Sequence, residues 1–129
     1  MYTKINDETY EVSTNLGTAY ELEKKFNKKI SDIATGINDF DIKQTIDVLY
    51  SGFKRKNPSV SEKDFEAMFM ESEDVGIVDL KKEVLVLLTL IMSKNKSEEQ
   101  VRRELEEKFK KSAEEAEDEA EEEAEEPKN

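Results

Sequence analysis

Polar and apolar residues alternate over the first dozen positions of the chain. Tyr10 and Val12 have polar neighbours on both sides, and Asn6-Asp7-Glu8 separates the segments YTKI and TYEV. Asn and Asp favour turns because their side chains bond the nearby backbone. The pattern predicts a short N-terminal β-hairpin. Two short strands are marginally stable alone, so the hairpin must lie on other elements.

The pattern then changes to steps of three and four, which indicates helices. The first apolar face consists of Leu16, Ala19, Leu22, Phe26 and Ile30. A short segment, 30–35, follows it and ends at Gly36. A second long helix is expected to begin near Asp39, a good N-cap residue, and to end at Asn57-Pro58, since proline disfavours a helical residue before it. Its apolar face consists of Ile42, Ile46, Leu49, Tyr50 and Phe53.

Three further helices are predicted beyond Pro58. Ser61 is the expected cap of the third long helix, and a fourth covers roughly 77–93. The middle of that fourth helix, Val84 to Met92, is apolar nearly all round, which indicates burial on several sides or a subunit contact. Ser97 and Gln100 have the capping-box spacing that opens a fifth helix.

The apolar edge of the fifth helix continues into the C-terminal tail with alanine in place of larger side chains. Alanine buries little, and glutamates oppose the dipole at a helix C-terminus, so we expect a stable helix to about Lys111 that frays beyond it. The predicted fold is mainly α: an N-terminal β-hairpin, four to five packed helices and a frayed acidic extension. We divide the chain into a helical domain with its hairpin, 1–111, and an acidic low-complexity tail, 112–129.

Charge is concentrated in this tail. The formal net charge is −12, and residues 113–126 hold ten acids and no base, whereas residues 1–112 hold 19 bases and 22 acids. A body so close to neutral does not suggest nucleic-acid binding, and the tail would repel phosphate. The longest apolar stretch, nine residues, is far shorter than the roughly 20 that span a bilayer. We therefore expect neither nucleic acid nor membrane as a partner.

Few residues suited to catalysis are present. The chain has no cysteine and no histidine, so it lacks a thiolate nucleophile, the usual general base and the commonest metal ligand. Acids such as Asp39 and Asp41, or Glu71, Glu73 and Asp74, are interpreted as solvated loop and cap residues. No spacing singles out two carboxylates for acid–base catalysis. We expect no enzyme activity, no cofactor and no metal site.

The dense basic cluster Lys54-Arg55-Lys56 has two interpretations. It could contact an acidic partner or a phosphate, or it could be the cationic end of the second long helix, which suits the helix dipole. The second interpretation is favoured.

The order of these features resembles the tail assembly chaperones of long-tailed phages of Gram-positive bacteria. The resemblance covers about residues 2–95 and lies in the hairpin KINDETYEV, the helix NLGTAYELEKKFNKKI and the segment DIKQTIDVLYSGFKRKNPSVSEKDFEAMF. It implies a mainly helical protein that forms homo-oligomers in the host cytoplasm. Such a protein keeps the tape measure protein soluble while tail tube protein assembles around it, and it is not expected in the mature virion.

Members of that family are often also made in a longer form by a −1 ribosomal frameshift. The last residues, Pro127-Lys128-Asn129, can be encoded by CCA AAA AAC, which contains the slippery heptamer A AAA AAC. A frameshift-extended form is therefore an expectation, and a final lysine codon of AAG would abolish that heptamer.

A chaperone of this kind must shield apolar stripes of its client weakly enough to be displaced. The client-binding candidates are the large apolar residues Phe53, Phe65, Met68, Phe69 and Met70. Methionine suits varied partners because its side chain adapts. The alternative is that these residues simply form the core between helices. A different function is also open, that of an acidic adaptor or inhibitor that binds a basic protein through the tail.

Overall fold

The computed structural model describes the backbone of residues 1–125 and the side chains of residues 1–112. Its elements are β1 (Tyr2–Ile5), β2 (Glu8–Glu11), α1 (Leu16–Phe26), α2 (Ile30–Thr35), the 3₁₀ helix η1 (Ile37–Asp39), α3 (Ile42–Lys56), α4 (Glu62–Met70), α5 (Ile77–Met92) and α6 (Glu98–Glu125). The predicted mainly α fold with an N-terminal hairpin is confirmed. The described part has six α-helices because 30–35 forms a helix of its own.

The hairpin is antiparallel and closes through a two-residue turn. Tyr2 lies opposite Glu11 and Ile5 opposite Glu8. Asn6 and Asp7 have φ angles of 51° and 68°, the left-handed conformation that a type I′ turn needs at both central positions. Glu8, expected in the turn, is the first residue of β2.

One face of the hairpin packs directly on the helices. Thr3, Ile5 and Val12 are buried, whereas Tyr2 and Lys4 are exposed. The Ser13 backbone N–H donates to the Gly52 carbonyl of α3 at 2.9 Å. A Cβ atom on Gly52 would lie 2.6 Å from the Ser13 carbonyl oxygen, closer than real Cβ atoms come. Glycine at this position lets the end of the hairpin reach the backbone of α3.

The first helix is shorter than its apolar pattern suggests. Asn15 caps α1 by accepting from the Thr18 N–H, and Asn27 ends it in the left-handed conformation with φ 52°. Ile30 consequently belongs to α2, not to the α1 face. Leu16, predicted to face the core, is 78% exposed because it occupies the first turn on the solvent side.

The second long helix begins two residues later than predicted. Asp39 lies in η1, and Asp41 caps α3 in a complete capping box with Gln44. The reciprocal bonds of that box fix the start of the helix. The predicted end at Asn57 and the predicted caps Ser61 and Ser97 are confirmed.

The core centres on α3 and α5. α5 packs against α2, α3 and α6, which confirms that its nearly all-apolar middle is buried on several sides. An aromatic cluster joins the hairpin to α3 and α4; its members are Tyr10, Tyr50, Phe53, Phe65 and Phe69. A smaller apolar contact of Val86, Leu90 and Val101 attaches the base of α6 to α5.

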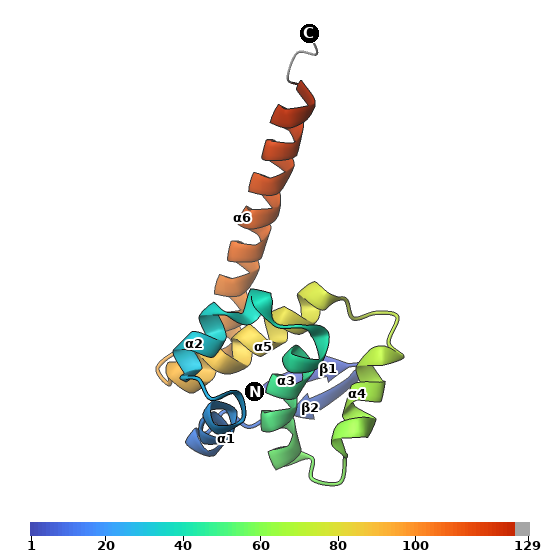
Figure 1. The fold of residues 1–129 in the computed structure, drawn as a ribbon, viewed down its shortest axis with the longest axis vertical. Coiled ribbons are helices and arrows are strands. Elements are labelled where there is room, and N and C mark those ends of the chain that lie inside the picture. The colour runs from blue at the N-terminus through green and yellow to red at the C-terminus, as the bar shows by residue number, and fades with distance from the viewer. Residues whose placement is uncertain (126–129) are drawn as a thin grey trace.

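Beyond this base, α6 leaves the body as a straight rod (Figure 1). Its backbone is helical to Glu125, past the Lys111 limit that we predicted. Alanine is the best helix former, so the alanine stripe favours the continuation, while the glutamates oppose the dipole. Fraying of the extension in solution stays a prediction, and 126–129 lie outside the described residues.

The close approach at Gly52 predicts a specific stability loss. Gly52→Ala should lower the free energy of unfolding by about 1–3 kcal/mol, because the methyl group meets backbone that cannot move without shifting the hairpin. Urea unfolding followed by circular dichroism measures the change.

Gly17→Ala in α1 is the matched control. Its nearest neighbour would be the end of the flexible Arg55 side chain, with a guanidinium nitrogen 2.7 Å from the Cβ. Its effect should stay within about 1 kcal/mol, since alanine also improves helix propensity. Equal losses in the two variants would contradict the proposed role of Gly52.

Candidate protein-binding groove

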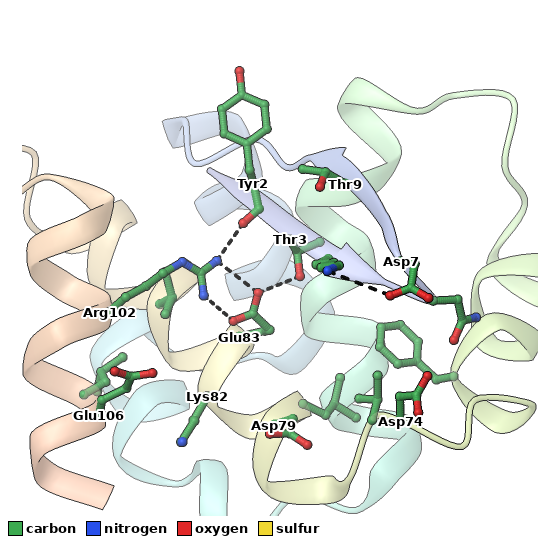
Figure 2. A pocket seen from close by; sticks show the side chains of 17 residues that line it. Tyr2, Thr3, Asp7, Thr9, Asp74, Asp79, Lys82, Glu83, Arg102 and Glu106 are labelled. Atoms are coloured by element: carbon green, nitrogen blue, oxygen red, sulfur yellow. Dashed lines mark hydrogen bonds and ion pairs between the residues drawn. The ribbon is translucent and has the colours of Figure 1, made fainter.

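A groove of about 650 Å³ lies beside β1. Figure 2 shows it between the hairpin, the loop from α4 to α5, α5 itself and the base of α6. Its polar or charged lining residues are Tyr2, Thr3, Lys4, Asn6, Asp7, Thr9, Asp74, Asp79, Lys82, Glu83, Arg102 and Glu106. Its apolar lining consists of Phe69, Val75, Leu80, Val86 and Leu105. The apolar residues of the groove are therefore surrounded by polar and charged side chains.

One end of the groove is held by a cluster around Arg102, which we call the α6 clasp (Tyr2, Thr3, Glu83, Glu98 and Arg102). The Arg102 guanidinium donates to both Glu83 oxygens, at 2.5 and 3.0 Å, and to the Tyr2 carbonyl at 2.6 Å. The Thr3 hydroxyl donates to Glu83 at 2.6 Å. Figure 2 shows Arg102 and Thr3 both bonded to Glu83, and Arg102 also bonded to Tyr2, so that the bonds join α5, α6 and β1. Hydrogen bonding to Glu83 raises the pKa of Arg102 above its ordinary value, so the guanidinium stays charged.

The clasp also occupies the outer edge of β1 at Tyr2. The Tyr2 N–H donates to Glu98 at 2.6 Å, and its carbonyl accepts from Arg102. On the opposite edge of the hairpin, Asn57 donates to the Glu11 carbonyl at 2.9 Å. Side chains thus cover one end of each outer edge, which limits uncontrolled strand pairing.

The five predicted client-binding residues occupy very different positions. Phe53 and Phe65 are 0% exposed, with ring centroids 4.3 Å apart in the core. In this structure the core interpretation describes both. Met68 and Phe69 are half-buried and Met70 is 61% exposed. Of the five, only Phe69 lines the groove.

Sequence reasoning missed most of the groove, because its lining comes from five separate helices and strands and from two of the segments that connect them. Thr3, Glu83 and Arg102 are far apart in the chain and meet only through the docking of α6 and the hairpin on α5. The alternation in β1 carried a usable signal: it places Tyr2 and Lys4 together on the solvent face.

Three acids away from the groove form an ion-paired cluster. Oxygen atoms of Asp47, Glu62 and Glu66 lie within 4.8 Å of one another, a spacing that could hold a cation. Lys43 contacts all three, and Lys25 contacts Asp47 and Glu62. Hydrogen bonds to Glu66 and Asp47 raise the pKa of Lys43. The ammonium groups of Lys25 and Lys43 supply the positive charge that a metal ion would bring. We therefore interpret the cluster as a structural one that holds α1, α3 and α4 together.

The basic cluster at the end of α3 pairs with the body. Lys54 and Arg55 contact Glu21, each at 3.0 Å, and Lys56 contacts Glu11 at 3.6 Å. Burial would raise the pKa of Glu21, but the two cations outweigh it and hold that pKa below its ordinary value. These partners agree with the favoured interpretation, the cationic end of a helix.

Comparisons with models of known protein families, with curated proteins and with solved structures each find no match to this chain. Among the described residues, no helix combines the length and the apolar character needed to cross a membrane.

The α6 clasp makes a testable contribution to stability. Arg102→Ala should lower the free energy of unfolding by about 1–3 kcal/mol, because Glu83 would lose a charged hydrogen-bond partner while remaining half-buried. Arg103→Ala removes the same side chain from the next, exposed position of α6, and it should change stability by no more than about 0.5 kcal/mol. Urea unfolding of both variants compares them, and equal effects would show that the clasp adds no stability.

Proposed function

We propose that this chain is an assembly chaperone of phage tails, a binding protein without enzyme activity that keeps the tape measure protein soluble during tail tube assembly. The observation that carries the proposal is the groove, where the half-buried apolar side chains of Phe69, Val75 and Leu105 lie beside charged residues. A surface of this kind can shield an apolar stripe and release it, because charged surroundings keep the empty groove soluble. The pattern-level resemblance over residues 2–95 supplies the identity of the client.

The remaining parts of the proposal follow from the same resemblance. The chaperone acts as a homo-oligomer in the host cytoplasm, together with tail tube protein, and it is also made in a frameshift-extended form. Exposed apolar side chains outside the groove, Leu16, Tyr20 and Met92, offer surface for contacts between copies. The acidic extension adds negative charge, which discourages aggregation of the chaperone–client complex.

Co-expression with the tape measure protein tests the proposal. The wild-type chain should raise the soluble fraction of that client several-fold, because a shielded apolar stripe cannot aggregate. Val75→Asp, which puts a charge on the apolar side of the groove, should remove most of this gain.

Ile77→Asp is the matched control, since Ile77 is a neighbouring apolar β-branched residue that does not line the groove. It should leave the gain intact, and urea unfolding checks that both variants fold. No gain with the wild-type chain would contradict the chaperone function. Equal losses in both variants would contradict the assignment to this groove.

The acidic adaptor is the second candidate, and the projection of the α6 backbone from the body favours it (Figure 1), because residues 113–126 carry ten acids that a basic protein could bind. Deletion of 113–129 distinguishes the two candidates. The chaperone account predicts that most client binding survives the deletion, since the groove lies within 1–112. Loss of all binding together with a steep salt dependence would identify the adaptor instead.

A further inference from the structure

We propose that the groove binds an extended, basic segment of the client, which adds to the outer edge of β1 as a third strand. The inference rests on the proposed function, because the segment would belong to the client protein. It goes further by naming the conformation and charge of what is bound. Three features of the groove support it: the open backbone edge of β1 at Lys4, the apolar residues of the groove floor, and the acidic side chains at its two sides.

The register of the hairpin shows which backbone groups face the groove. The Val12 N–H donates to the Met1 carbonyl at 2.7 Å, and the Met1 amino group donates to the Val12 carbonyl at 3.0 Å. Residues alternate in direction along a strand, so Tyr2 and Lys4 direct their backbone groups away from β2. The contacts of Tyr2 with Glu98 and Arg102 agree with this register.

Lys4 is the position where this edge stays open. Tyr2 is covered by the α6 clasp, whereas the Lys4 N–H and carbonyl have no hydrogen-bond partner among the described residues, and Lys4 lines the groove. Edge backbone groups of this kind are what an added strand pairs with. A helix would satisfy its own backbone and leave them unpaired, which is why we favour a strand.

The floor beside β1 suits the alternating side chains of a strand. Leu80 and Val86 on α5 are nearly fully buried, and Phe69 and Leu105 stand half-buried at the sides. A strand added to β1 would direct every second side chain toward α5, on the same side as Thr3 and Ile5. The bound segment should therefore alternate apolar with polar residues.

Charge selects a basic segment. The groove has five lining acids and three lining bases. Arg102 pairs with Glu83, Lys4 lies 3.8 Å from Asp7, and Asp79 accepts from the Gly76 N–H at 2.9 Å. Asp74 and Glu106 have no cationic partner among the described side chains, and Figure 2 shows them on opposite sides of the groove. Lysine or arginine near both ends of the bound segment would complement them.

Alternate N-methylation of a synthetic peptide tests strand addition directly. The probe is a peptide of about nine residues that alternates valine with threonine and carries lysine at each end. One version is methylated at every valine nitrogen and another at every threonine nitrogen, so that each version blocks one edge of the strand. Binding to the full chain is followed by calorimetry and by the amide NMR signals of Lys4, Val75 and Leu105.

We expect one methylated version to lose affinity by about tenfold or more and the other to bind like the parent peptide. Added salt should lower the affinity of the parent peptide, because it screens the attraction between the peptide's lysines and the acids of the groove. Loss in both versions would indicate a helical ligand, and loss in neither would indicate binding without backbone pairing. Either result, or signal changes outside the groove, would overturn the proposal.

Two proline variants test the same edge from the protein side. Lys4→Pro removes the outward N–H of β1, and Glu11→Pro removes an outward N–H on the outer edge of β2, at a position opposite Tyr2 that does not line the groove. Only Lys4→Pro should reduce peptide binding by about tenfold.

The co-expression assay separates the two proposals. If Lys4→Pro retains client solubility while Val75→Asp loses it, strand addition is wrong and the chaperone function stands. If the wild-type chain itself fails to keep the client soluble, the proposed function is wrong, whatever the peptides do.

Discussion

Contact between the N-terminal hairpin and the backbone of α3 is the constraint on which the rest of the structure depends. A pair of four-residue strands has little stability of its own. It is ordered here because Val12 and Ser13 reach Gly52 directly and because Ile5 enters the core. A side chain at position 52 would hold the hairpin away from α3 and open the aromatic cluster of Tyr10, Phe53 and Phe65.

The docked position of the hairpin also creates the candidate site. With one face of β1 on the core, its outer edge borders the groove, and the α6 clasp covers only the first part of that edge. The charged pair of Glu83 and Arg102 therefore fixes α6 and also sets where the open edge begins. The same contacts hold α6 on the body and limit the open edge of β1, so changes in the clasp should affect both stability and binding.

Local patterns predicted the elements well, because each depends on residues close in sequence. Capping by Ser61 and Ser97, the stop at Asn57 and the buried middle of α5 follow from hydrogen bonding and periodicity. The start of α3 was misplaced because Asp39 and Asp41 are both good caps, and only Gln44 completes a box with Asp41. The groove was not predicted, since burial of Phe53 and Phe65 and exposure of the β1 edge depend on how distant elements pack.

Native-state hydrogen exchange of individual amides tests the central claim, that the hairpin is a docked part of the core with one open edge. The account predicts that the Val12 and Ser13 amides exchange as slowly as amides in α3 and α5, while the Lys4 amide exchanges rapidly in the same molecule. Rapid exchange throughout the hairpin, with α3 still protected, would show that the hairpin opens independently and would contradict the account.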